Sequence, residues 1–285
     1  MKFIRTGKYT QDALTRSVEI NSLNEAQARL KRTNYLLGFI MNQIPEVFPE
    51  YLNNLLTKYW SLLEDERIKT NPPDLEELIS EYPNLIEHPE FTRAVLNYFI
   101  QILQLPAETK LGKHKVVNKN YFQLFSHLSY HNLSVLTETI GRTEAISLYK
   151  RFVTHYYLEN RNPNRETYDN LETLFAKAIE PKEVPSDWVI VRGMIRNGKY
   201  AYRNENCLWI DAIEDLLDSE LKYYVCCYGD YERAKDYHDS IILTMKHTIA
   251  QGDRYCSRVL HDTRVDWDLR HPPKCFWDNI EVENE

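Results

Sequence analysis

The sequence predicts an α+β fold, in which an N-terminal helical region precedes a C-terminal domain of antiparallel strands and helices. Up to about residue 180, apolar residues recur at helical spacing. From Trp188 onward the pattern becomes rich in β-branched residues, and Asn197-Gly198 is a strong hairpin signal. We expect a helical region over residues 1–120, an α+β domain over 121–264 and a tail over 265–285 that wraps over the surface.

The first helix of the helical region is expected to begin at Ser22. Ser22 and Glu25 match a capping box, in which two side chains bond to backbone N–H groups of the first turn. Prolines and Gly141 divide the pattern that follows. Further helices are expected over residues 50–67, 74–81, 89–103, 121–139, 142–160 and 166–180. The lysine-rich segment 106–120 is interpreted as a solvated loop.

The C-terminal domain is expected to contain a second hairpin closed at Gly252, which can take the positive φ of a tight turn. With a two-residue loop, Ile249 would face Cys256 and His247 would face Arg258, and all four side chains would share one sheet face. The expected elements are a helix over 207–217 and strands over 188–196, 240–249 and 254–261, whereas 220–237 is ambiguous.

The composition excludes several classes of protein. A net charge of −7 argues against nucleic acid as the partner, because phosphate binding needs a concentrated basic surface. No apolar run reaches the roughly 18 residues that span a bilayer, and no secretory signal is recognised, so we expect a cytoplasmic protein with no membrane partner. The 5 cysteines are then expected to be reduced thiols.

No cofactor and no metal are expected. Cys226 and Cys227 are adjacent and do not form the spaced pair that structural zinc prefers. The histidines and aspartates between His261 and His271 do not match a known metal spacing, and they are interpreted as exposed tail residues. The sequence also contains no phosphate-binding, dinucleotide-binding or serine-hydrolase motif.

An ordered set of short motifs lies in the last third of the chain. Cys207-Leu208-Trp209 opens a helix after a hairpin, Cys227-Tyr228-Gly229-Asp230 follows, and the turn Thr248-Ile249-Ala250-Gln251-Gly252-Asp253 leads to Cys256. In this order and spacing the set resembles the L-2-amino-thiazoline-4-carboxylic acid hydrolase family. More distantly, the region is similar to the 4-vinyl reductase domain, a small α+β ligand-binding domain.

The resemblance implies a hydrolase that adds water to the amidine-like carbon of a 2-aminothiazoline ring and expels a thiolate, leaving an N-carbamoyl cysteine. The sequence departs from the family pattern at two places. Met245-Lys246 stands where the family has an Arg-Thr pair, and Ser257 to Leu260 replace Asp-Phe-Arg-Phe-like residues. The substrate class implied is therefore a small heterocycle or amidine, and its identity is left open.

The candidate site combines these motifs with general acid–base chemistry. Cys227 and Asp230 lie three residues apart and would share a helix face. The carboxylate disfavours a thiolate beside it, so Asp230 is the expected base or orienting group and Cys227 a packed wall. Histidine is the side chain best suited to proton transfer near neutral pH, which makes His247 a candidate. The predicted catalytic residues are Cys227, Asp230, His247 and Cys256, and the predicted substrate-binding residues are Thr248, Arg258 and Cys207.

Several of these candidate residues also have a purely structural interpretation. Cys227 can be a buried small apolar residue, and His247 a satisfied strand histidine. The alternative function is a non-enzymatic small-molecule or lipid-binding module of the 4-vinyl reductase type, with tyrosines lining an apolar cavity. A third possibility is a helical interaction protein. A small molecule is the expected partner in the first two cases, and a homo-oligomer is left open.

Overall fold

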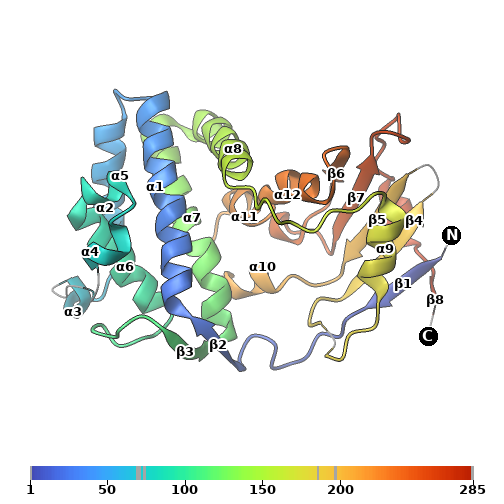
Figure 1. Cartoon of the computed structure of the whole chain (residues 1–285), viewed down its shortest axis with the longest axis horizontal. Helices are drawn as coiled ribbons and strands as arrows, with labels where there is room; N and C mark the ends of the chain where they lie inside the picture. The colour runs from blue at the N-terminus through green and yellow to red at the C-terminus, as the bar shows by residue number, and fades with distance from the viewer. Residues whose placement is uncertain (1, 69–71, 73–74, 185, 196–197, 284–285) are drawn as a thin grey trace. The chain divides into compact units, whose positions relative to one another are not determined.

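The computed structural model describes residues 2–68, 72, 75–184, 186–195 and 198–283, and it is an α+β protein as predicted (Figure 1). The chain forms two compact units: Leu14–Phe152, and Met1–Ala13 together with Val153–Glu285. These units divide the chain at other residues than the predicted ranges 1–120, 121–264 and 265–285, because strands near both ends of the chain join one sheet.

The helical unit begins with a helix whose cap differs from the prediction. Helix α1 (Ser22–Gln43) follows Asn21, whose side-chain oxygen accepts hydrogen bonds from the N–H groups of Leu23 and Asn24 at 3.1 and 3.3 Å. Asn21 is therefore the N-cap. The predicted capping box at Ser22 is wrong, since Ser22 is already helical and buried, and its hydroxyl donates to the carbonyl of Gly112.

The remaining helices of this unit follow the predicted apolar pattern closely. Gly141, with a φ of +86°, separates the last two, which agrees with the break predicted there. They are α2 (Phe48–Leu62), α3 (Asp65–Ile68), α4 (Leu75–Ile79), α5 (Pro83–Ile86), α6 (Pro89–Ile102), α7 (Asn118–Ile140) and the start of α8 (Arg142–Glu159). Buried tyrosines join two of them, α2 and α7, because the hydroxyls of Tyr51 and Tyr59 donate to the backbone carbonyl and side-chain oxygen of Asn132 at 3.1 and 2.8 Å.

The loop predicted over 106–120 is wrong in its second half. Strand β3 (Lys113–Val117) pairs antiparallel with β2 (Ser17–Asn21), from Ser17↔Val117 to Asn21↔Lys113. Exposed lysines alternate here with more buried residues, and Val116 and Ile20 are buried on the ribbon. The charge of the lysines concealed a period of two residues, which is the strand period.

The second unit is built on a six-stranded sheet with the order β6-β7-β5-β4-β1-β8. Neighbouring strands are antiparallel except for the parallel pair of β1 and β8. The strands are β1 (Phe3–Thr6), β4 (Ile190–Ile195), β5 (Lys199–Asn204), β6 (Ile241–Met245), β7 (Cys256–Asp262) and β8 (Val282–Glu283). The helices are the end of α8, α9 (Leu171–Ile179), α10 (Leu208–Ala212), α11 (Ser219–Cys226), α12 (Gly229–Tyr237), the short 3-10 turn η1 (Ile249–Gln251) and α13 (Lys274–Asp278).

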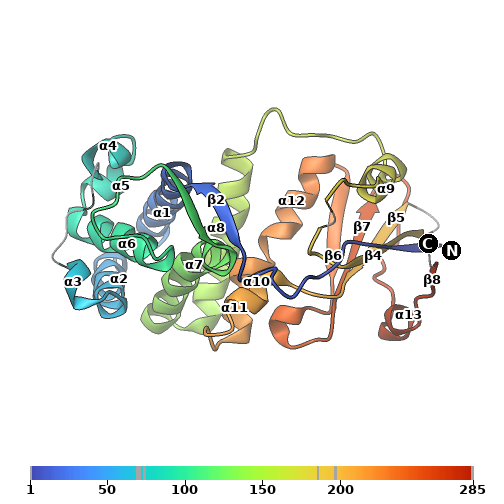
Figure 2. The same cartoon turned by 90° about the horizontal axis from the view of Figure 1, so that it is seen from below.

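Each face of this sheet has its own cover. Figure 2 shows α9 and α12 on one side of the strands and α13 on the other. The helix-covered face buries Leu171, Leu174, Tyr200, Ala234, Ile241, Leu243 and Leu260. The tail-covered face buries Phe3, Val191, Ala201, Tyr255, Val259 and Trp277. Because successive strand residues point to opposite faces, neighbouring residues of β7 serve different environments.

The C-terminal segment does not wrap loosely over the surface as predicted. Trp277 is fully buried, its indole N–H donates to the carbonyl of Pro272 at 3.1 Å, and the guanidinium of Arg203 bonds to its backbone oxygen. Strand β8 continues the segment into the sheet. The burial of this one large aromatic side chain thus fixes the position of an otherwise polar segment.

The two predicted hairpins have different outcomes. Strands β4 and β5 pair from Ile190↔Asn204 to Ile195↔Lys199, and Gly198 has a φ of +69°, while Asn197 lies outside the described residues. The hairpin of β6 and β7 exists, and Gly252 has the predicted positive φ, at +94°.

The predicted register of the second hairpin is wrong. Arg258 pairs with Met245 and not with His247. The N–H of Thr248 donates to the Asp253 carboxylate at 2.9 Å, which closes a local turn and ends the strand early.

Candidate functional site

A half-buried ion pair lies on the helix-covered face of the sheet. Arg258 of β7 places Nη1 2.7 Å from Oδ2 of Asp230, which is in the first turn of α12. Tyr202 of β5 is paired in register with Arg258, and its ring centroid lies 6.0 Å from the guanidinium carbon. Burial acts to lower the pKa of Arg258, but Asp230 together with the nearby tyrosine and thiol groups outweighs it and raises that pKa above its ordinary value. The guanidinium is therefore a permanent positive charge between sheet and helix.

Three of the predicted cysteines surround this ion pair. Cys207 precedes α10, Cys227 follows α11, and Cys256 begins β7; each is buried, and Arg258 contributes to the electrostatics of all three. We call these three residues, with Asp230 and Arg258, the Arg258 cluster.

Burial decides the protonation of the three thiols. It raises the pKa of Cys207 to about 12 and the pKa values of Cys227 and Cys256 above the ordinary range, although Arg258 opposes these shifts. The thiols are therefore protonated at neutral pH. They suit packed walls better than nucleophiles, which supports the role predicted for Cys227 beside Asp230.

Tyrosines line the helix side of the same region. The hydroxyls of Tyr223 and Tyr231 lie 3.1 Å apart. Burial raises the pKa values of Tyr202, Tyr223 and Tyr237, so these phenols stay protonated and can donate hydrogen bonds. The sequence indicated the number of tyrosines, but not that several of them meet here.

Two predicted site residues lie elsewhere. His247 Nδ1 is 2.9 Å from the hydroxyl of Ser257, and Ser257 alternates with Cys256 and Arg258 along β7. His247 therefore contacts the tail-covered face, and the expectation that it shares a face with Cys256 and Arg258 is wrong. Thr248 is buried in the turn, where its hydroxyl donates to the side-chain oxygen of Gln251 at 2.9 Å.

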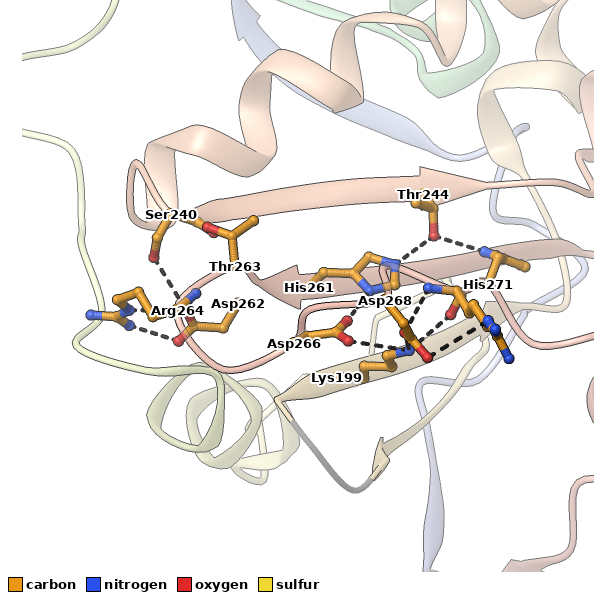
Figure 3. Close-up of polar contacts among 11 residues, drawn as sticks. Lys199, Ser240, Thr244, His261, Asp262, Thr263, Arg264, Asp266, Asp268 and His271 are labelled. Atoms are coloured by element: carbon orange, nitrogen blue, oxygen red, sulfur yellow. Dashed lines mark hydrogen bonds and ion pairs between the residues drawn. The ribbon is translucent and has the colours of Figure 1, made fainter.

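The tail-covered face carries a chain of hydrogen bonds that the sequence did not reveal. Its centre is Thr244, whose hydroxyl oxygen lies 2.7 Å from His261 Nε2 and 2.9 Å from His271 Nδ1 (Figure 3). His261 Nδ1 is 2.5 Å from Oδ2 of Asp266, and His271 Nε2 is 2.9 Å from the hydroxyl of Ser257. We call these five residues, with His247 beyond Ser257, the polar chain.

Lys199 holds the carboxylate end of the polar chain. Its ammonium lies 3.4 Å from Oδ1 of Asp266 and 2.5 Å from Oδ1 of Asp268 (Figure 3). His261 and Ser257 are fully buried, and Asp266 is 3% exposed. The sequence interpretation of His261, Asp266 and His271 as exposed tail residues is therefore wrong. The sequence signal that could have indicated the burial of His261 was the alternation of Ser257, Val259 and His261 along one strand face.

The direction of every proton in the polar chain follows from its carboxylate end. Burial lowers the pKa of His271 to about 4 and also lowers the pKa of His261, so both rings are neutral at pH 7. The N–H of His261 Nδ1 donates a hydrogen bond to Asp266, which leaves Nε2 to accept a hydrogen bond from Thr244. Thr244 then accepts from Nδ1 of His271, and Ser257 donates to Nε2 of His271.

The neutral histidines make the stability of this unit depend on pH. The pKa of His271 falls from 6.5 to about 4 on folding, so between these values the unfolded state binds more protons and stability decreases as the pH is lowered. Asp262 and Asp268, whose pKa values are lowered, lose their contribution only below the ordinary 3.8. Urea unfolding from about pH 7 to pH 4.5 should show this decline, and His271→Gln should make it shallower. An unchanged slope in the variant would contradict the assignment.

A pocket opens at the edge strand β6. Its volume is about 560 Å³, which is enough for a molecule the size of an amino acid. It is lined by Tyr231, Leu243, Thr244, Met245, Lys246, Asp268, Leu269, Arg270 and His271. Thr244 and His271 belong to the polar chain, whereas Tyr231 adjoins Asp230 and Met245 is paired with Arg258. The pocket therefore includes two residues of the polar chain, and it reaches neighbours of the Arg258 cluster but none of its members.

Two further observations concern ligands and membranes. Among the residues that the structure describes, no group of three or more histidine, cysteine, aspartate or glutamate side chains is arranged to hold a metal ion. Within the same described part of the chain, each helix is too short or too polar to cross a membrane. All five cysteines are free thiols.

Comparisons with known proteins match the second half of the chain to one family. The family model described as L-2-amino-thiazoline-4-carboxylic acid hydrolase matches residues 121–259. No match was found among curated proteins. A crystal structure of an H-NOX protein from S. oneidensis is similar with a TM-score of 0.23 and 12% sequence identity, over 84% of this chain and 98% of that chain. A score at this level carries no argument about fold or function.

Proposed function

We propose that the chain hydrolyses a small cyclic amidine bearing a carboxylate, because residues 121–259 match the family model described as L-2-amino-thiazoline-4-carboxylic acid hydrolase. The matched region contains Asp230, Arg258 and all three cysteines of the Arg258 cluster. The proposed products are those of ring opening, with a ureido group and a free thiol.

One observation carries this proposal. Cys207, Cys227, Asp230 and Cys256 come from separate short motifs of the sequence, and in the folded chain they gather around the guanidinium of Arg258. Residues that carry a sequence resemblance and also converge in space are good candidates for one site. Asp230 keeps 23% of its side chain exposed, so a substrate can approach it.

The proposed chemistry assigns each group a task. Asp230 accepts a proton from water as the water oxygen bonds to the amidine carbon. The tetrahedral intermediate then breaks its carbon–sulfur bond, and the leaving thiolate takes up a proton. Arg258 holds Asp230 in place and supplies positive charge near the substrate carboxylate. A neutral tyrosine hydroxyl such as that of Tyr231 donates to the ring nitrogen.

The test is turnover of 2-amino-thiazoline-4-carboxylate, with N-carbamoyl cysteine followed by mass spectrometry. Asp230→Asn removes the base but keeps the shape, and it should lower kcat by about 100-fold or more. The matched control is Asp236→Asn on the same helix, which removes a carboxylate 2.9 Å from Arg161 and should leave kcat unchanged. Absence of product with the wild-type chain rejects this substrate, and equal turnover by Asp230→Asn rejects the role of Asp230.

The alternative function, a small-molecule binding module without catalysis, predicts a different outcome. A ligand that fits the pocket would raise the melting temperature of the chain without being converted. The Cys227→Ala, Asp230→Ala double variant would then bind as the wild type does. Stabilisation by apolar ligands together with no turnover of any amidine would favour this alternative.

A further inference from the structure

Three residues of the polar chain have the relative positions of a nucleophile, a base and an orienting carboxylate. The hydroxyl of Thr244 is 2.7 Å from His261 Nε2, and His261 Nδ1 is 2.5 Å from Asp266 (Figure 3). A hydroxyl bound to a histidine that is itself bound to a carboxylate is the arrangement used for nucleophilic catalysis on unrelated folds. We propose that Thr244, His261 and Asp266 form a second hydrolytic centre, which acts on small anionic esters or similarly activated acyl compounds.

The directions of the hydrogen bonds fit this role. Because Nδ1 of His261 keeps its proton and donates it in a hydrogen bond to Asp266, Nε2 is free to accept the proton of Thr244. The N–H of His271 donates to the Thr244 oxygen at 2.9 Å and holds the orientation of the hydroxyl. A hydroxyl oxygen has two lone pairs, and this hydrogen bond uses one of them. The other remains for attack on a substrate carbon.

The surroundings indicate the substrate class. Thr244 lines the pocket of about 560 Å³, and so do Lys246 and Arg270. The wall carries two cationic side chains and one carboxylate, Asp268, which is paired with Lys199 at 2.5 Å, and this excess of positive charge favours a substrate with a carboxylate. Lys199 lies behind Asp266 at 3.4 Å and does not reach Thr244 in the described contacts. The polar chain thus leads from a buried carboxylate to a hydroxyl at the pocket.

The reaction balances without a cofactor. The oxygen of Thr244 bonds to the acyl carbon while its proton passes to Nε2 of His261. The bond to the leaving group breaks, and His261 returns the proton to that group. Water then attacks the acyl-threonine, gives a proton to His261, and releases the carboxylic acid as the Thr244 hydroxyl re-forms. Asp266 is a positioning residue, because it fixes the tautomer of His261 and touches no reacting atom.

The probe is mono-p-nitrophenyl succinate, an activated ester with a carboxylate. The wild-type chain should release p-nitrophenol faster than buffer, and a succinyl group trapped by acid quenching should map to Thr244. Thr244→Val removes the hydroxyl with little change of shape and should lower the rate by about 100-fold or more, while Thr244→Ser should retain activity. Thr263→Val is the matched control, since that hydroxyl donates to the carbonyl of Ser240 at 2.9 Å and lies outside the pocket lining.

A positioning role for Asp266 has its own readout. Asp266→Asn offers an amide N–H to Nδ1 of His261, so Nε2 keeps the proton and cannot accept from Thr244. The variant should lose the ester reaction while its melting temperature stays near that of Thr263→Val. Hydrolysis by Thr244→Val at the wild-type rate, a succinyl group on another residue, or no rate above buffer would each overturn the proposal.

This centre does not rest on the proposed function, and the two fail separately. Asp230 lies on the other face of the sheet, so the Asp230→Asn variant should hydrolyse the ester as the wild type does. Loss of ester hydrolysis in Asp230→Asn would show that the Arg258 cluster performs both reactions and would overturn the inference. Failure on the thiazoline with retained ester hydrolysis would reject only the proposed function.

Discussion

Replacing Asp230 with alanine is expected to lower the free energy of unfolding by about 3 kcal/mol. The Arg258 side chain is 15% exposed, and Asp230 Oδ2 lies 2.7 Å from its Nη1. Removal of the carboxylate leaves a buried positive charge without its partner, which costs more than the ion pair contributes. The value is at the low end of the usual range because Asp230 itself keeps 23% exposure. Urea unfolding followed by circular dichroism measures it.

A double variant separates the orphaned charge from simple loss of contacts. Asp230→Ala with Arg258→Met replaces the guanidinium by an apolar side chain of similar length, and it should recover most of the lost stability. Asp236→Ala on the same helix removes an ion pair at a more exposed position and should cost less than about 1 kcal/mol. If the single Asp230 variant were as stable as the wild type, Arg258 would have to reach solvent or another anion.

Replacing Trp277 with alanine is expected to lower the free energy of unfolding by about 3 to 5 kcal/mol. The side chain is 0% exposed and packs with Phe3, Val191 and Val259 on the tail-covered face. Its ring centroid also lies 5.3 Å from that of His271, so the polar chain loses a neighbour when the indole is removed. Chemical denaturation gives the stability, and protease cleavage after Lys274 should accelerate.

The chain offers a matched control for this substitution. Trp267 is 90% exposed in the same C-terminal segment, and Trp267→Ala should change the free energy of unfolding by no more than about 0.5 kcal/mol. Equal effects at Trp267 and Trp277 would contradict the view that one aromatic anchor fixes the segment.

Local patterns predicted the helices better than the strands of this protein. The apolar spacing predicted the bounds of α6 and α7 to within a few residues, because the residues that form one helix face lie only three or four positions apart in the sequence. Strand β3 was missed because its lysines resemble a solvated loop, and β1 because its partner β4 lies more than a hundred residues away. Pairing between distant strands leaves little trace in a local pattern.

The candidate site was also predicted only in part. Motif spacing indicated Cys227, Asp230 and Cys256, and these lie around Arg258 in the folded chain. The position of His247 depended on a hairpin register that Asp253 changes through one side-chain bond. His261, Asp266 and His271 could not be recognised, because their burial results from a distant tryptophan that holds the C-terminal segment on the sheet.

The helical unit, Leu14–Phe152, interrupts the sheet unit in the sequence, and this order affects folding during synthesis. The helical unit is one continuous stretch and can fold as soon as it leaves the ribosome. Strand β1 emerges before the helical unit, whereas its partners β4 and β8 are made after it. Until then its edges are unpaired, so nascent chains are exposed to aggregation through β1, and slow closure of this long-range pairing should limit the folding rate.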